Sequence, residues 1–232
     1  LGQGTTTQVI GDAPGEMGDA LAVTNLGTGR TATSISAGLP TSSAHTCAVL
    51  DDGSVKCWGS NNFGQLGIGN TTTMGDTAGR MGDNLSTVDL GTGRTAVDVS
   101  VGNQFSCALL DNGDVKCWGV NGKGQLGIGT TTAMGDNANE MGDNLAAVDL
   151  GTGRTAVAIS TGYWHACAIL DNGGMKCWGD NDYGQLGIGS TTDIGDQAGE
   201  MGDNLSYTSL GTGLTPVYID AGNAHTCAIF DN

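Results

Sequence analysis

Short apolar runs alternate with turn residues along the chain, and no run shows the 3.6-residue spacing of an amphipathic helix. In the segment AVDVSV (96–101), the valines Val97, Val99 and Val101 alternate with small or polar residues. This two-residue period is that of a β-strand. We expect the preceding segment LSTVDL (85–90) to form another short strand.

A hairpin is predicted immediately downstream. The segments SCALL (106–110) and DVKCWG (114–119) flank Asp111-Asn112-Gly113. Asn-Gly between two apolar runs favours a tight turn, because glycine tolerates a positive φ. With the two segments upstream, this gives four short antiparallel strands.

The four segments belong to a unit of 60 residues that recurs along the chain. The first cysteine of each unit lies at Cys47, Cys107, Cys167 and Cys227. The sequence GQLGIG begins at Gly64, Gly124 and Gly184. The chain thus holds about 3.8 units, which we place at residues 1–65, 66–125, 126–185 and, incomplete, 186–232.

Repeated groups of four antiparallel strands predict an all-β fold, a β-propeller of four-stranded blades. Neighbouring blades would cover both faces of each sheet, which explains why the run CALL (107–110) is almost continuously apolar. The alternative is a linear β-solenoid, although solenoid coils are usually shorter than this unit.

The recurring pattern GxxHTCALLDxGxVKCWGxNxxGQLGIG resembles the repeat of the regulator-of-chromosome-condensation family. The resemblance implies a seven-bladed propeller of four-stranded blades. The present chain would then be a partial ring or a segment of a propeller, with the remaining blades supplied by a longer chain or by another copy. The chain differs from the eukaryotic prototype in its regular cysteine pairs and its longer, acidic loops between units.

The cysteines flank the predicted hairpin turn symmetrically. When Leu110 is placed opposite Asp114, the count outward puts Cys107 opposite Cys117, within the range of a disulfide. The same count pairs Cys47 with Cys57 and Cys167 with Cys177, and leaves Cys227 unpaired. Reduced thiols packed as small apolar residues are one alternative, and zinc sites are another, although zinc knuckles have closer spacing. Disulfides would indicate an extracellular or cell-surface protein.

Composition and charge exclude several classes of function. The chain has 42 glycines and 3 prolines among 232 residues, and its formal charge is −16. No basic run is present, so binding to nucleic acid is not expected. No apolar run has the length of a membrane span, so membrane insertion is not expected either.

No constellation typical of catalysis stands out, and we expect no enzymatic activity. Histidines occupy equivalent positions at His45, His165 and His225, and Phe105 takes that place in the second unit. A position that recurs in each blade and tolerates phenylalanine is more typical of a structural residue than of a catalytic one. The repeated tryptophans Trp58, Trp118 and Trp178 are expected in the core or between blades.

The loops between units carry recurring carboxylates and amides, which are ligands that Ca²⁺ prefers. Asp136, Asp143 and Asn144 are the candidate calcium ligands in one such loop. The alternative is that these residues form turns. No other cofactor is indicated.

Positions that differ between units are the candidate binding residues, since the repeated positions build the scaffold. They lie in the loops before the third and after the fourth predicted strand, and include Phe63, Phe105, Tyr163, Trp164, His165 and Tyr183. Aromatic side chains on rigid turns are typical of protein-binding surfaces. Bacterial propellers of the resembled family that inhibit β-lactamases bind through such tips. We therefore expect a non-enzymatic, secreted or surface-displayed protein-binding propeller. The alternative is a structural repeat module of a large adhesin or surface assembly, stabilised by calcium if the loops bind it.

Overall fold

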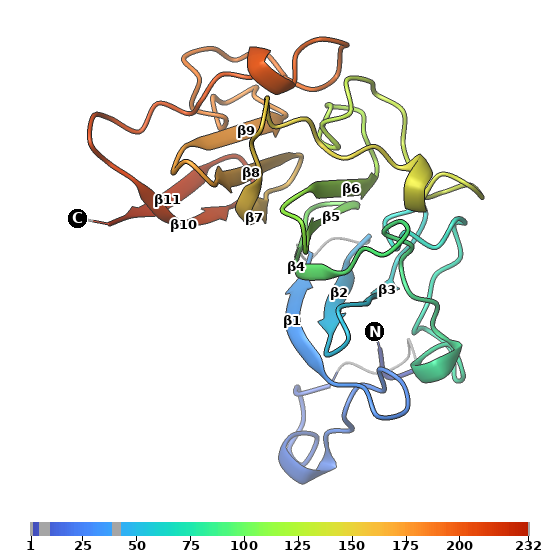
Figure 1. Ribbon diagram of the computed structural model, residues 1–232. Coiled ribbons are helices and arrows are strands. Elements are labelled where there is room, and N and C mark those ends of the chain that lie inside the picture. Colours follow the sequence, from blue (N-terminus) through green and yellow to red (C-terminus); the bar gives the residue numbers. More distant parts are fainter. Residues whose placement is uncertain (1, 5–9, 39–42, 232) are drawn as a thin grey trace.

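The computed structural model describes residues 2–4, 10–38 and 43–231. The regular secondary structure of these residues consists of strands and short 3₁₀ helices, joined by turns and loops (Figure 1). The strands are β1 (Ala32–Ala37), β2 (His45–Leu50), β3 (Val55–Gly59), β4 (Ala96–Val101), β5 (Phe105–Leu110), β6 (Val115–Gly119), β7 (Ala156–Thr161), β8 (His165–Leu170), β9 (Met175–Gly179), β10 (Pro216–Ala221) and β11 (Thr226–Phe230). The 3₁₀ helices are η1 (Gly18–Ala20), η2 (Gly82–Asn84), η3 (Gly142–Asn144) and η4 (Gly202–Asn204). No helix in the described ranges is long and apolar enough to cross a membrane.

The strands form one antiparallel sheet per repeat. Three sheets have three strands each, in the orders β1-β2-β3, β4-β5-β6 and β7-β8-β9, and the fourth consists of β10 and β11. The sheets follow one another in chain order, and the first strand of each lies beside the first strand of the next (Figure 1). The all-β prediction is therefore confirmed.

Three of the sheets have three strands, so the strand predicted at residues 85–90, the first of its unit, is not found. This segment follows the outer edge of β3 through the backbone bond from Val88 N to Val55 O, 2.8 Å. Its ends bond elsewhere. Leu85 N donates to Gly82 O within η2, and Leu90 O accepts from the ammonium of Lys116. The segment thus covers the edge of the preceding sheet without forming a ladder.

A β-bulge breaks the alternation expected in residues 96–101. Ala96 pairs with Leu110 and Asp98 with Leu109, so Val97 has no partner of its own. Val97 is therefore 55 % exposed, whereas Val99 is buried. An extra residue in one strand shifts the following side chains to the other face, which the simple two-residue period does not anticipate.

The hairpin register and the disulfides agree with the prediction. Leu110 N donates to Asp114 O, and Cys107 lies opposite Cys117. The bonded pairs are Cys47–Cys57, Cys107–Cys117 and Cys167–Cys177, with Cα atoms 4.1, 4.1 and 4.0 Å apart. Cys227 is exposed and unbonded.

The hydrophobic core lies between the sheets. One cluster joins Val49 and Val55 of the first sheet to Val99 of the second. Trp118 and Trp178 are fully buried, and each indole donates to a backbone carbonyl of the preceding repeat, Gln65 O and Gln125 O, at 3.0 and 3.1 Å. The tryptophans therefore join neighbouring sheets, as predicted.

A ladder of serines joins the first strands. Ser36 Oγ accepts from Val101 N at 3.0 Å, Ser100 Oγ from Thr161 N at 3.0 Å, and Ser160 Oγ from Ala221 N at 2.9 Å. Each bond runs from one sheet to the next, so the same contact recurs at every junction.

Candidate functional site

In the first three repeats, the two variable loops meet at one end of the sheet. Asp180 N donates to Trp164 O, and Val120 N to Gln104 O, both at 2.9 Å. Ser60 N donates to Ala44 O in the first repeat at 3.1 Å. We call this end the tip face, and define it by residues 43–44, 60–63, 103–104, 120–123, 163–164 and 180–183.

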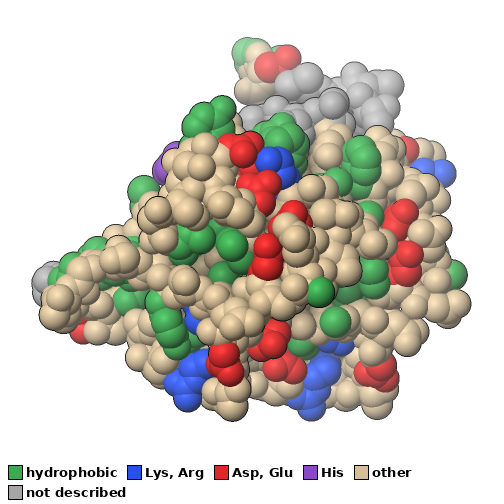
Figure 2. Space-filling view, turned by 90° about the horizontal axis from the view of Figure 1, so that it is seen from above, with side chains coloured by type: hydrophobic (Ala, Val, Ile, Leu, Met, Phe, Trp, Pro, Cys, Tyr) green, Lys and Arg blue, Asp and Glu red, His purple; other side chains and the backbone are tan. Residues whose placement is uncertain are grey.

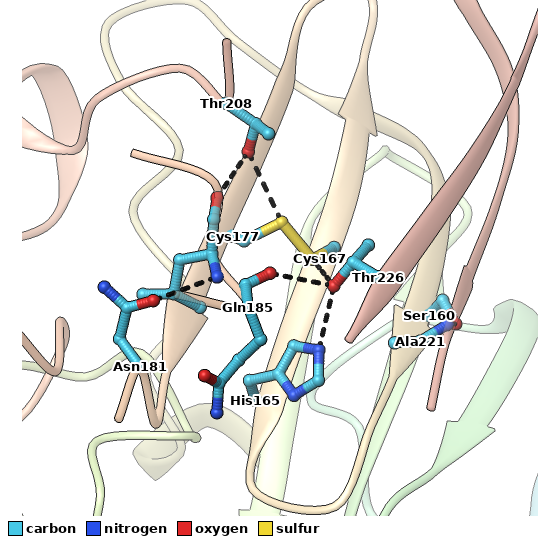
Figure 3. The surroundings of a disulfide bond; sticks show 10 residues. Ser160, His165, Cys167, Cys177, Asn181, Gln185, Thr208, Ala221 and Thr226 are labelled. Carbon is cyan, nitrogen blue, oxygen red and sulfur yellow. Dashed lines mark hydrogen bonds between the residues drawn. A yellow bond between two sulfur atoms is a disulfide. The ribbon is translucent and has the colours of Figure 1, made fainter. Parts of the chain in front are cut away.

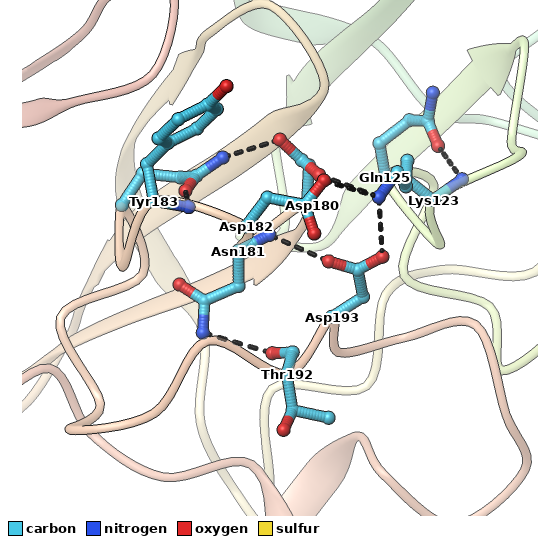
Figure 4. A network of polar contacts seen from close by, with 9 residues as sticks. Lys123, Gln125, Asp180, Asn181, Asp182, Tyr183, Thr192 and Asp193 are labelled. Atoms are coloured by element: carbon cyan, nitrogen blue, oxygen red, sulfur yellow. Dashed lines mark hydrogen bonds and ion pairs between the residues drawn. The ribbon is translucent and has the colours of Figure 1, made fainter.

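An ion-pair cluster joins two repeats on the tip face (Figure 4). The ammonium of Lys123 lies 3.0 Å from a carboxylate oxygen of each of three aspartates, Asp180, Asp182 and Asp193. Two further bonds hold the carboxylates in place. Gln185 Nε2 donates to Asp180 at 2.6 Å, and Asn181 N to Asp193 at 2.8 Å.

The cluster has a strong local field. Hydrogen bonds from Lys123 to Asp182 and Asp180 raise the pKa of this lysine above its ordinary value, so the ammonium stays charged. Three carboxylates around one ammonium leave negative charge in excess. On the face that Figure 2 shows, acidic side chains are scattered and the few Lys and Arg lie close to some of them.

Among the residues that the structure describes, these three aspartates have carboxylate oxygens close enough together to hold a metal ion, within 4.8 Å of one another. Their shared centre already binds the ammonium of Lys123. The cluster is thus an ion-pair network held by a protein cation.

The aromatic residues of the tip face differ in exposure. Tyr183 is 80 % exposed and Phe63 is 38 % exposed. Tyr163 and Trp164 are half-buried, and their rings pack edge to face with centroids 4.9 Å apart. Tyr183 therefore offers the largest free apolar surface among them.

Two predicted binding residues lie in the interior instead. Phe105 and His165 are both 0 % exposed. They are the first residues of β5 and β8, where their side chains turn between neighbouring sheets. His165 Nε2 lies 3.0 Å from Thr226 Oγ1 of the next repeat (Figure 3). These two residues join sheets and have no surface to offer a partner, which corrects their assignment to the binding surface.

The predicted calcium ligands Asp143 and Asn144 bond to protein groups in the loops. Both carboxylate oxygens of Asp143 accept from Thr92, its amide at 2.8 Å and its hydroxyl at 2.6 Å. Asn144 donates to Asn139 O. Burial raises the pKa of Asp136, and a hydrogen bond with Glu140 adds to that shift. The structure thus gives these residues the roles of turn and loop contacts.

Buried lysines were missed by the sequence reasoning. Lys56, Lys116 and Lys176 are 6, 8 and 2 % exposed. Lys116 Nζ donates to Leu90 O at 3.0 Å and to Gly142 O at 2.8 Å, and the other two make the equivalent bonds. Each lysine thereby connects the GTG turn before its sheet to the acidic loop after it. The signal was present in the sequence, since three of the four lysines occupy the same position of the repeat.

Comparisons with known proteins agree with this geometry. The Regulator of chromosome condensation (RCC1) repeat matches residues 32–65, 96–125 and 156–185 in one form and 52–109 in another. The human E3 ubiquitin-protein ligase HERC2 is 33 % identical over 150 residues, which are 64 % of this chain and 3 % of the ligase. The Arabidopsis thaliana ultraviolet-B receptor UVR8 is 28 % identical over 154 residues, 64 % of this chain and 30 % of the receptor. The chain thus spans less than a third of these relatives.

Solved structures show the same fold. Prp20p from Saccharomyces cerevisiae matches with a TM-score of 0.60 at 17 % identity, over 80 % of this chain and 41 % of that chain. Human WBSCR16 matches with a TM-score of 0.52 at 16 % identity, over 100 % of this chain and 65 % of that chain. The family's repeat recurs along the chain at the spacing of its sheets, and the chain belongs to the regulator of chromosome condensation (RCC1) repeat family.

Proposed function

We propose that the chain is a non-enzymatic protein-binding scaffold whose partner contacts the tip face. One observation carries this proposal. Phe63, Lys123 and Tyr183 occupy the same position of three successive repeats, directly before the first glycine of GQLGIG. The motif GQLGIG is identical in these three repeats, whereas the residue before it differs in each. Packing therefore fixes the residues that follow and leaves this position free to vary.

The chemistry of the tip face suggests the character of the partner. Tyr183 projects an exposed ring, and Asp182 beside it belongs to a cluster with more carboxylates than ammonium groups. Tyrosine at the centre of an interface contributes strongly to binding. Excess carboxylates favour arginine or lysine on the partner. We propose a partner with an exposed basic segment.

Relatives support protein binding in general terms. Prp20p was described with its binding to Gsp1p and histones, and Kap60 was crystallised bound to yeast RCC1. These partners belong to those proteins, and the likeness to them concerns the fold.

The disulfides support a proposal about location. Three bonded pairs hold three successive sheets. Such bonds persist in oxidising compartments, so we propose a secreted or cell-surface protein.

The test compares three forms of the chain as bait for the secreted and surface proteins of its source. The first is the wild type, and the second carries Tyr183→Ala with Asp182→Ala. The control carries Tyr218→Ala, which removes an exposed tyrosine of β10 outside the tip face. A partner should be retained by the wild type and the control, lost with the tip variant and released by salt. A partner that the tip variant retains equally would refute the role of the tip face.

A structural repeat module is the second candidate. The serine ladder recurs at all three junctions, and the buried lysines recur in three repeats, a regularity that a spacer would require. A spacer should stiffen an assembly without a tip-dependent partner, so the same three baits separate the two functions.

A further inference from the structure

Two exposed serines outside the tip face make no contribution to the hydrogen bonding of the fold. Ser86 and Ser206 follow η2 and η4 at the same place of their repeats. Within the described residues, neither hydroxyl donates or accepts a hydrogen bond. Ala146 takes this place after η3 and is exposed as well, so the fold does not require a hydroxyl there.

Each serine lies two residues after an exposed asparagine. Asn-Leu-Ser at residues 84–86 and 204–206 matches the pattern Asn-x-Ser/Thr, which is the acceptor of asparagine-linked glycans in secreted proteins. Asn-Thr-Thr at residues 70–72 is a third match, and all three of its residues are exposed. The equivalent Asn-Leu-Ala at residues 144–146 lacks the hydroxyl, so the chain contains its own negative comparison.

The amide nitrogens of the acceptors can carry a sugar without loss of their contacts. Asn84 Nδ2 donates one hydrogen bond, to Gly79 O at 3.0 Å, and Asn204 Nδ2 donates one to Gly199 O at 2.8 Å. A side-chain amide has two N–H groups, and a glycan replaces one of them. The remaining N–H can keep the bond that closes the loop.

The buried asparagines of the repeat lack this freedom. Asn181 is 0 % exposed, and its Nδ2 donates to Ser190 O at 2.9 Å and to Thr192 O at 3.0 Å (Figure 4 shows the second bond). Asn61 and Asn121 make the equivalent two bonds. None of these three asparagines stands in an Asn-x-Ser/Thr pattern. The pattern thus falls on asparagines with a free N–H at the surface.

The acceptors on η2 and η4 lie on the outer rim of the fold. Asn84 and Asn204 are the last residues of these helices, which lie on the outer side of the arc of sheets, whereas the first strands lie on its inner side (Figure 1). Glycans are bulky and solubilising. On this rim they would cover the loops between repeats and leave the tip face, which other loops form, open to a partner.

We propose that Asn70, Asn84 and Asn204 are acceptors of asparagine-linked glycans. The inference rests on the proposed secreted or cell-surface location, because such glycans belong to exported chains. The donor is an oligosaccharide carried on a lipid diphosphate. The asparagine Nδ2 attacks the anomeric carbon of the first sugar, and a carbon–nitrogen bond forms. The bond from that carbon to the phosphate oxygen breaks, and the lipid diphosphate leaves with the electron pair and takes up the proton lost by the amide.

The test maps the chain isolated from the cells that produce it naturally. Mass spectrometry compares its peptides before and after peptide-N-glycosidase in heavy-oxygen water, which converts each glycosylated asparagine to a labelled aspartate. We expect glycans and label at Asn70, Asn84 and Asn204, and neither at Asn144. An exported chain that lacks a glycan at one of the three would overturn the assignment of that residue. An exported chain without any would overturn the proposal and leave the location intact, whereas a chain found only inside the cells would overturn both.

Variants made in the same cells test the role of the hydroxyl. Ser86→Ala should lose the glycan of Asn84, and the control Thr87→Ala should retain it, because Thr87 is exposed and lies outside the pattern. Ala146→Ser should gain a glycan at Asn144, whose Nδ2 makes the equivalent single bond within its loop. A glycan on Asn84 in Ser86→Ala, or an unmodified Asn144 in Ala146→Ser, would overturn the proposal.

Discussion

The imidazole of His165 faces the hydroxyl of Thr226 in the next sheet, with Nε2 and Oγ1 3.0 Å apart. His45 faces Ser106 in the same way at 2.7 Å. Between these junctions, Phe105 replaces the histidine and Ala166 replaces the hydroxyl, and both lie in one buried cluster. At these three junctions a polar pair thus alternates with an apolar pair, and Nε2 of each buried imidazole has a hydroxyl partner.

Acid should destabilise the histidine junctions. Burial lowers the pKa of His45 from 6.5 to about 3, against a smaller opposing effect of a backbone hydrogen bond at Ser43, and burial lowers that of His165 to about 4. Between pH 6.5 and these values the unfolded chain binds protons that the folded chain does not. The free energy of unfolding therefore falls as pH drops through this window, at about 1.4 kcal/mol per pH unit and histidine at most.

Urea unfolding at a series of pH values checks this prediction. The double variant His45→Phe with Ser106→Ala copies the junction of Phe105 and Ala166. It should show a shallower loss of stability below pH 6.5 than the wild type. The same slope in both proteins would mean that His45 does not contribute to the acid sensitivity.

Replacing Lys116 by Met should destabilise the chain by about 1–3 kcal/mol, because two carbonyls lose their buried donor. Arg94→Met is the matched control, since Arg94 forms an exposed ion pair with Asp111 and should change stability by less than about 1 kcal/mol. Denaturant midpoints compare the two variants. Equal losses of stability in the two variants would show that the buried hydrogen bonds of Lys116 do not stabilise the fold.

Each hairpin disulfide should contribute about 2–3 kcal/mol to stability in the chain-entropy model, because the loop that it closes is short. Cys107→Ser with Cys117→Ser should lower the denaturant midpoint accordingly. Peptide mapping without reductant should find the three bonded pairs and a free Cys227. Alkylation of all seven cysteines in unreduced protein would contradict the pairing.

Removing the ammonium of Lys123 should turn its cluster into a cation site. In Lys123→Ala, three carboxylates would face one another without a counter-charge, so we expect a lower melting temperature that Ca²⁺ restores. In the wild type, Ca²⁺ and chelator should leave the melting temperature unchanged. Differential scanning fluorimetry measures both. A wild-type response to Ca²⁺ would point to another site in the loops.

The two aromatic positions of the tip face should differ in their effect on stability. Tyr183→Ala should change stability by no more than about 0.5 kcal/mol, because the ring is exposed. Trp164→Ala should cost more, because its ring is half-buried against Tyr163. Equal denaturant midpoints for the two variants would show that the packing of Trp164 against Tyr163 does not stabilise the fold.

The sequence predicted what depends on contacts close in the chain. Cys107 and Cys117 face each other because a short turn fixes their register, and a count of residues suffices. The bulge at Val97 could not be predicted by such a count. The extra residue leaves the apolar pattern almost intact but changes which face of the sheet each side chain lies on.

Contacts between repeats were harder to predict. Lys116 is buried by a turn and a loop that lie 26 residues away on either side, and a lysine is expected at the surface unless both are known. The segment 85–90 has the composition of a strand, but its end carbonyl is taken by that lysine. His165 was assigned to the surface because its partner Thr226 lies 61 residues further on.

The pairing of His165 with Thr226 bears on how such arrays can grow in evolution. A unit can be duplicated or deleted within a gene only if the new junction still joins compatible partners. A crossover could place a unit whose second strand begins with histidine before a unit that has alanine at the position of Ala166. The imidazole would then be buried without its hydroxyl partner, at a cost of about 1–3 kcal/mol. Exchanges that keep each first residue of the second strand together with the residue 61 positions later avoid this cost. Neighbouring units should therefore be duplicated or deleted together as pairs, with recombination breakpoints that leave the junction between them intact.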